Sequence, residues 1–131
     1  MQEVGTAIIV CDGKIFIGQR PEGKPLAGLW EFPGGKRESG ETITQCIKRE
    51  LKEEINVDSE VGAHIMDVIH SYPELNKEFL LKVYMVKINN SSDIELKVHQ
   101  SCAWVKVEEM KQYKFLPADY KIIQKLQEIA I

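Results

Sequence analysis

The chain has 131 residues, of which 44% are hydrophobic, and this composition excludes a fully disordered protein. The length suits a single domain over residues 1–131 and leaves little room for a second. With 17 basic against 20 acidic residues and a net charge of −3, the chain lacks the basic excess of a dedicated nucleic-acid binder. A small anionic ligand held by a few local groups is compatible with this charge.

The N-terminal segment predicts a β-hairpin. Residues 6–10 and 14–18 are apolar, β-branched runs, and the pair Asp12-Gly13 between them is a turn signal. No basic leader or small-residue cleavage site accompanies the first run, so we interpret it as a strand and not as a signal peptide. The sequence has no run of 18 apolar residues, and we therefore expect no membrane span.

The next segment predicts a loop and a short strand. Residues 21–28 are polar and rich in Pro and Gly, which is typical of a loop. Residues 29–32 favour a strand that places Trp30 and Phe32 on one face, because side chains alternate along a strand. The sequence Pro-Gly-Gly-Lys at 33–36 is expected to end this strand.

The clearest helix extends from about Thr42 to Ile55. Thr42 and Gln45 have the form of a capping box at its start. Asn56 follows its end, where a residue in the left-handed conformation commonly terminates a helix. The apolar side chains of this helix recur at helical spacing, and they are Ile43, Cys46, Ile47 and Leu51.

The second half of the chain predicts three further strands and one helix. Its segments are apolar strands at 61–71 and 78–88, an exposed loop at 89–97 and a short strand at 103–107. Pro117 introduces a C-terminal helix, whose apolar positions are Ile122, Ile123, Leu126 and Ile129. Strands and helices are mixed and a hairpin comes first, which favours an α/β sandwich with a mixed sheet over a doubly wound parallel fold.

The cysteines indicate a reducing compartment. Cys11, Cys46 and Cys102 are odd in number, far apart and without a Cys-x-x-Cys pair. Such spacing does not favour a disulfide framework, and we therefore expect a cytoplasmic protein.

Acidic residues cluster on the predicted helix. Glu50, Glu53 and Glu54 are i, i+3 and i+4 neighbours, so their carboxylates converge on one side. A hard divalent cation with oxygen ligands, Mg²⁺ or Mn²⁺, would relieve the repulsion between them. Arg49 lies four residues before Glu53 and can form an ion pair with it. A solvated acidic face is the other interpretation, which the lysines on this helix support.

The spacing around this cluster resembles the signature of the Nudix hydrolases. Gly35 is followed after five residues by Glu41 and after seven more by the run Arg49-Glu-Leu-Lys-Glu-Glu. The resemblance covers nearly the whole chain and is strongest to the MutT branch, and within it to the CTP pyrophosphohydrolase subgroup. It implies a Nudix-type α/β/α sandwich with a mixed central sheet and a catalytic loop–helix–loop motif. The further matching segments are Gln19-Arg, Gly28-Leu-Trp-Glu-Phe-Pro-Gly-Gly-Lys, His99-Gln, Trp104 and Leu116-Pro-Ala-Asp.

The resemblance also implies roles for the signature residues. Members of this branch convert a nucleoside triphosphate and water into the monophosphate and pyrophosphate. The metal ligands would be the carbonyl of Gly35 and the carboxylates of Glu50, Glu53 and Glu54. Mg²⁺ would be the cofactor, with Mn²⁺ as an alternative, and Glu50 or Glu53 would orient or deprotonate the attacking water. Glu41 and Arg49 would support the helix.

Two positions depart from the family pattern. The family usually has Gly where this chain has Asn56, and Asn is the usual substitute at a left-handed helix end. A Glu often precedes the His-Gln pair in similar enzymes, whereas this chain has Val98. A metal ligand or base expected from that loop is therefore missing, or Glu95 replaces it. His99 itself is interpreted as a solvated or hydrogen-bonding loop residue.

Four positions would line the nucleotide pocket by the same resemblance, and they are Arg20, Glu31, Phe32 and Asp119. Phe32 offers a stacking face, and Arg20 can donate to a base or a phosphate. Asp119 would accept from the exocyclic amine of cytosine or from the N–H groups of a guanine or oxidised-guanine edge. The other interpretation of Asp119 is an ordinary acidic residue in the first turn of a helix.

We therefore expect a metal-dependent nucleoside triphosphate pyrophosphohydrolase that favours CTP, dCTP or a 5-substituted dCTP. The alternative is an 8-oxo-dGTP sanitising diphosphatase. Hydrolysis of a nucleoside diphosphate linked to another group is less favoured, because we find no additional motif for it. A non-catalytic Nudix binding module is less favoured, because all the signature acids are present. The expected partner is a small-molecule nucleotide, with no stable nucleic acid or membrane partner, and the protein is either a monomer or a homodimer.

Overall fold

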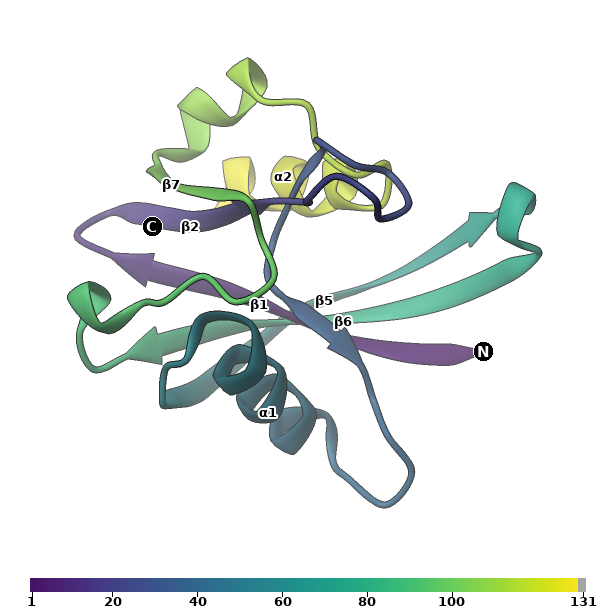
Figure 1. The fold of residues 1–131 in the computed structure, drawn as a ribbon, viewed down its shortest axis with the longest axis horizontal. Coiled ribbons are helices and arrows are strands. Elements are labelled where there is room, and N and C mark those ends of the chain that lie inside the picture. The colour runs from purple at the N-terminus through teal and green to yellow at the C-terminus, as the bar shows by residue number, and fades with distance from the viewer. Residues whose placement is uncertain (130–131) are drawn as a thin grey trace.

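The computed structural model describes residues 1–129, in which a mixed β-sheet lies between two helices (Figure 1). The strands are β1 (Gln2–Cys11), β2 (Lys14–Gln19), β3 (Trp30–Glu31), β4 (Gly34–Lys36), β5 (Ser59–Tyr72), β6 (Lys77–Ile88) and β7 (Ser101–Val105). The helices are α1 (Ile43–Ile55) and α2 (Asp119–Glu128), and short 3₁₀ helices span Pro73–Leu75, Ser91–Asp93 and Val107–Gln112.

Strand β1 is central and combines parallel with antiparallel pairing. It runs parallel to β6 and antiparallel to β2 and β4. The strand order is β3-β2-β1-β6-β5, and β7 extends the sheet by pairing with β2. A parallel pair needs a long crossover connection, and the chain between β1 and β6 supplies one that includes α1. The mixed sheet confirms the predicted α/β class.

Alternating side chains of the central strands divide the core into two layers. In β1, Ile8 belongs to the apolar cluster that contains Leu126 of α2, whereas Ile9 belongs to the cluster that contains Leu51 of α1. This alternation follows from the two-residue period of a strand. Burying one such side chain stabilises the fold by about 1.5–3 kcal/mol. With α1 and α2 on opposite faces of the sheet (Figure 1), the predicted α/β/α sandwich is confirmed.

The local signals of the first hairpin and of α1 are confirmed. Asp12 and Gly13 both have positive φ angles, 52° and 76°, as the two central residues of a type I′ turn require. Thr42 and Gln45 form the predicted capping box. Asn56 ends α1 in the left-handed conformation, with φ 57° and ψ 40°. In residues 1–129, no helix is both long and apolar enough to cross a membrane.

The secondary structure of the segment that contains Gly34 and Gly35 differs from the prediction. The segment expected only to end a strand forms β4, which pairs with β1. Gly34 has a φ of +146°, and a Cβ at this position would overlap the carbonyl oxygen of Gly5. Glycine therefore allows two backbones to approach here, which a sequence signal for a turn does not distinguish.

The C-terminal elements are shifted from their predicted bounds. The strand predicted at 103–107 is β7 at Ser101–Val105, and Val107 instead begins a 3₁₀ helix. The helix after Pro117 is confirmed as α2, but Ile129 lies beyond its end and is exposed. The apolar repeat alone could not locate this end, because the last turn of a helix is fixed by its capping and not by its periodicity.

Candidate active site

Two glycines set the distance between α1 and the sheet. A Cβ on Gly5 of β1 would come within 2.7 Å of Ile47 Cγ1, and a Cβ on Gly35 of β4 would overlap the Glu50 carboxylate. The first contact seats the apolar face of α1 against β1. The second brings the backbone of β4 and an acidic side chain of α1 together, as a site built from a carbonyl and a carboxylate requires.

Arg49 of α1 organises the acidic residues around it. Its Nη2 donates to Glu41 Oε1 at 2.7 Å and its Nε to Glu41 Oε2 at 3.0 Å, a bidentate pair. Its Nη1 donates to Glu50 Oε1 at 2.8 Å and approaches Glu53 Oε2 at 3.3 Å. The predicted Arg49–Glu53 ion pair is confirmed. Hydrogen bonds from Arg49 lower the pKa of Glu41 to about 2.

The three signature carboxylates occupy different environments. Glu54 is buried, and its pKa is raised by desolvation and by the nearby acidic groups Glu50 and Glu31. The Glu53 side chain is 58% exposed and turns toward Arg49. The structure therefore brings Glu50 and Glu54 together and leaves Glu53 at the rim. Buried, mutually repelling carboxylates of this kind are stabilised by a cation.

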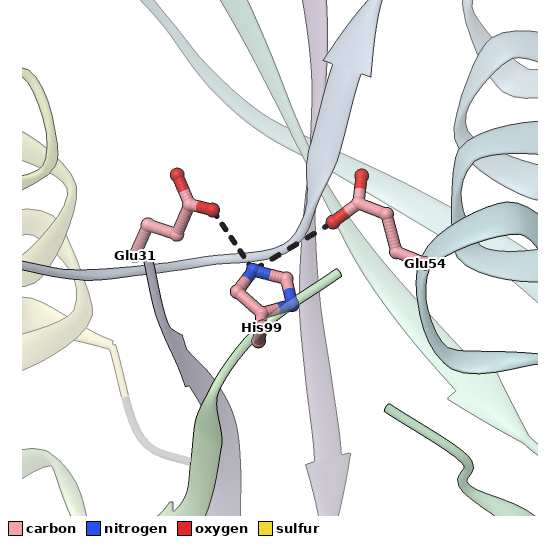
Figure 2. A group of neighbouring side chains, drawn as sticks. All are labelled: Glu31, Glu54 and His99. Atoms are coloured by element: carbon pink, nitrogen blue, oxygen red, sulfur yellow. Dashed lines mark hydrogen bonds and ion pairs between the residues drawn. The ribbon is translucent and has the colours of Figure 1, made fainter. Parts of the chain in front are cut away.

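The donor set fits a hard divalent cation. Carboxylates from α1 and a backbone carbonyl of β4 offer oxygen atoms, which Mg²⁺ and Mn²⁺ prefer. The carbonyl of Gly35 accepts from Cys46 Sγ at 3.4 Å, which fixes it beside α1. A second group of ligand atoms, all within 4.8 Å of one another, comes from Glu31, Glu54 and His99 (Figure 2). Glu54 thus connects the α1 carboxylates with the residues of β3 and the segment before β7.

Arg20 and Glu31 form an ion pair, and Glu31 is the member of it that belongs to the group with Glu54 and His99. Arg20 Nη1 donates to Glu31 Oε1 at 3.0 Å, and both side chains are largely but not fully buried. Arg20 Nε also donates to the carbonyl of Pro25 at 2.9 Å, which holds the guanidinium against its own loop. The sequence-predicted pocket residues Arg20 and Glu31 therefore lie together.

Asp119 is a buried carboxylate at the start of α2. It is 4% exposed, and its Oδ2 accepts from the backbone N–H of Phe32 at 3.3 Å. Burial and the nearby charge of Glu31 raise its pKa well above the usual value. The N-cap of α2 is Ala118, and Asp119 is the acidic residue of its first turn, as the other interpretation of the sequence expected.

Phe32 contributes to this region through its backbone. Its ring is 5% exposed and packs in the core, with its centroid 5.5 Å from that of Phe115. Its N–H, rather than its ring face, points to Asp119. Trp30 and Trp104 are partly buried and pack against the core, Trp30 on Tyr113 and Trp104 on Phe16.

The loop before β7 differs from its family-based expectation. Val98 is exposed, and Glu95 accepts from Asn56 Nδ2 at 2.8 Å. The Glu95 carboxylate is therefore bound at the C-terminal end of α1. His99, interpreted from the sequence as a solvated or hydrogen-bonding loop residue, is buried between Glu31 and Glu54 and hydrogen-bonds to Glu31.

Sequence reasoning also missed Tyr72 at the end of β5. Tyr72 is buried, and its pKa is raised by desolvation and by the negative charge of Asp119. Its aromatic neighbours are His70 and Phe79. The strand predicted from the sequence ended at residue 71, so Tyr72 lay outside it and carried no local signal for a site.

Comparisons with known proteins agree with this geometry. A family model described as NUDIX domain matches residues 5–125. The CTP pyrophosphohydrolase of Escherichia coli K12 is 36% identical over 124 residues, which cover 95% of this chain and 90% of that protein. The 8-oxo-dGTP diphosphatase of Proteus vulgaris is 43% identical over 68 residues, 50% of this chain and 61% of that protein.

The fold of this chain is also similar to that of solved Nudix-family neighbours in structure comparisons. The solution structure of the E. coli ORF135 protein superposes with a TM-score of 0.85 at 34% identity, covering 98% of this chain and 89% of that chain. Similarity at this level extends over both helices and the whole sheet of the described residues.

Proposed function

Because the chain belongs to the Nudix family of pyrophosphohydrolases, we propose that it hydrolyses CTP, dCTP or a 5-substituted dCTP to the nucleoside monophosphate and pyrophosphate. The observation that carries the choice of base is the buried carboxylate of Asp119, which accepts from the backbone N–H of Phe32, the residue after Glu31. The similarity to a CTP pyrophosphohydrolase over 95% of the chain supports the same choice.

The metal-binding part of the site would consist of Gly35, Glu50, Glu53 and Glu54. Mg²⁺ is the proposed ion, with Mn²⁺ as an alternative, and when bound it supplies charge neutralisation on the phosphate oxygens and a more acidic water. Phosphoryl transfer depends mainly on such neutralisation and on positioning. Arg49 holds Glu50 in place, and Glu50 or Glu53 orients or deprotonates the water.

The base-binding part of the site would consist of Arg20, Glu31, Phe32 and Asp119. Carboxylate oxygens accept hydrogen bonds, so Asp119 and Glu31 favour a base edge with an amine over one with a carbonyl. Cytosine carries an exocyclic amine where uracil carries an oxygen. Because Asp119 is buried, a lost hydrogen bond there would not be replaced easily by water.

A second candidate function is the hydrolysis of 8-oxo-dGTP. The N–H donors on an oxidised-guanine edge also suit the carboxylates of Glu31 and Asp119. The 43% identity to an 8-oxo-dGTP diphosphatase over half of the chain favours this candidate. It would use the same metal residues and differs in the size of the base and in the donors on the edge that is recognised.

A substrate panel distinguishes these candidates. We would measure kcat/KM for CTP, dCTP, 5-methyl-dCTP, UTP, dGTP and 8-oxo-dGTP at one Mg²⁺ concentration and identify the products. The proposal predicts the highest values for the cytosine nucleotides, with monophosphate and pyrophosphate as products. A highest value for 8-oxo-dGTP would select the second candidate. A nucleoside diphosphate with free phosphate, or no turnover of any nucleotide, would contradict both.

A further inference from the structure

His99 lies within the site but has no part in the function proposed above. It belongs to the segment before β7, and its side chain is 0% exposed. A Cβ on Gly18 of β2 would lie 2.6 Å from its Cδ2, 2.7 Å from its Cγ and 2.9 Å from its Nε2. Because three ring atoms are almost equally close, the imidazole rests on the backbone of Gly18. Any larger residue at position 18 would displace the ring.

One ring nitrogen of His99 faces two carboxylates. Its Nε2 lies 2.8 Å from Glu31 Oε2 and 3.8 Å from Glu54 Oε1 (Figure 2). Carboxylate oxygens accept, so Nε2 carries a proton and donates it to Glu31. The other nitrogen, Nδ1, is buried with no hydrogen-bond partner within residues 1–129. The hydrogen bonding of the ring therefore goes through Nε2 alone, because a proton on Nδ1 would have no acceptor.

Glu31 is held through both of its carboxylate oxygens. Oε1 accepts from Arg20 Nη1 at 3.0 Å, and Oε2 accepts from His99 Nε2 at 2.8 Å. A free glutamate rotates about several side-chain torsions, and the last of these is broad. Two donors on opposite oxygens fix that torsion, so the plane of the Glu31 carboxylate is held in one orientation.

We infer that His99 is a positioning residue, which orients Glu31 for base recognition and so contributes to nucleotide selectivity. The inference rests on the proposed role of Glu31 in the base pocket. Without the donor from His99, the Glu31 carboxylate would be held by Arg20 through Oε1 alone, with a carboxylate oxygen of Glu54 within 4.8 Å. The carboxylate would then turn away, and a misaligned acceptor forms a weak hydrogen bond.

The test compares three variants of His99 that differ in their donor. Leu removes the donor and keeps much of the volume. Gln carries an amide nitrogen near the position of Nε2, whereas Asn carries its amide one bond short of that position. The measurements are kcat and KM for CTP and UTP, and the melting temperature of each variant.

The inference predicts that His99→Leu lowers the CTP-to-UTP ratio of kcat/KM by about tenfold, mainly through a higher KM for CTP. His99→Gln should recover most of the ratio, and His99→Asn should not. If His99→Leu does not fold, the comparison between the Gln and Asn variants carries the same test. Equal losses for CTP and UTP, or an unchanged ratio in the variants that lack the donor, would overturn the inference.

A double-mutant cycle with Glu31 tests whether His99 acts through it. In the Glu31→Gln background, His99→Leu should have little further effect on the CTP-to-UTP ratio, because the group that His99 orients is already changed. Independent, additive losses would contradict the positioning role. The CTP-to-UTP ratio of kcat/KM in wild type shows whether a failure belongs to the role of His99 or to the proposed function itself. No preference for CTP over UTP in wild type would reject the proposed base and this role together, whereas a preference that His99→Leu leaves unchanged would reject only the role of His99.

Discussion

The backbone N–H of Phe32 donates a hydrogen bond of 3.3 Å to Oδ2 of Asp119, 87 residues further along the chain. This bond joins the residue that follows β3 to the first residue of α2. A carboxylate that is 4% exposed is costly to bury, and the bond offsets only part of that cost, since the pKa of Asp119 stays raised. An acidic group kept in such surroundings is a candidate for binding a ligand.

Replacing the acidic residues of α1 should separate activity from stability. We expect Glu53→Gln and Glu54→Gln each to lower kcat by orders of magnitude, because each removes a charged ligand without removing volume. Glu54→Gln should not lower the melting temperature, because burial already raises the pKa of Glu54 and thus disfavours its charge. Steady-state kinetics and thermal melting measure both quantities.

The matched control for these variants is Glu60→Gln, which removes an exposed charge on β5 and should leave kcat unchanged. Activity should also disappear with a chelator and return with Mg²⁺ or Mn²⁺. Near-normal turnover of both α1 variants at ordinary Mg²⁺ concentrations would reject the metal assignment.

The pair of Glu41 and Arg49 should make stability depend on pH in the acidic range. Arg49 lowers the pKa of Glu41 from 4.5 to about 2, so the folded state holds the ionised form more strongly than the unfolded state does. The stabilisation is therefore complete above the unfolded value and is lost as the pH falls toward the folded value. The melting-temperature difference between wild type and Glu41→Gln should be largest above pH ~5 and shrink steadily below it. A difference that is constant with pH would contradict this origin.

The left-handed residue at the end of α1 predicts a specific order of stabilities. Asn56→Ala should lower the free energy of unfolding by about 1–2 kcal/mol, because a Cβ without a local hydrogen bond is unfavourable at a φ of 57°. Asn56→Gly should cost much less, since glycine adopts this conformation freely. Glu95→Gln controls for the Asn56–Glu95 hydrogen bond. The free energies of unfolding are measured by chemical denaturation. A value for Asn56→Gly that is equal to or lower than the value for Asn56→Ala would contradict the expected effect of the cap.

The predictable parts of the fold were those with local causes. The hairpin follows from Asp12-Gly13, and α1 follows from its apolar spacing together with the capping box at Thr42 and Gln45. The signature acids followed from spacing along one helix. Each of these signals is contained within a few residues, so a single sequence carries them.

The remaining parts depend on contacts between distant segments. Strand β4 exists because Gly34 lies against Gly5, and no local pattern distinguishes that contact from a turn. His99 is buried because Gly18 leaves space for its ring, 81 positions earlier in the sequence. Glu53 faces Arg49 at the rim instead of converging fully with its neighbours, because helical spacing gives the face of a residue but not its rotamer.

The most direct measurement of the central claim is the CTP-to-UTP ratio of kcat/KM in wild type and in Asp119→Ala, with a melting curve for each. If the Asp119 carboxylate accepts from the amine of the base, its loss should lower kcat/KM for CTP by about ten- to a hundredfold, with little change for UTP. The ratio should then fall mainly through KM. A wild-type ratio retained by Asp119→Ala, accompanied by a lower melting temperature, would contradict base recognition and leave Asp119 as a structural residue of α2.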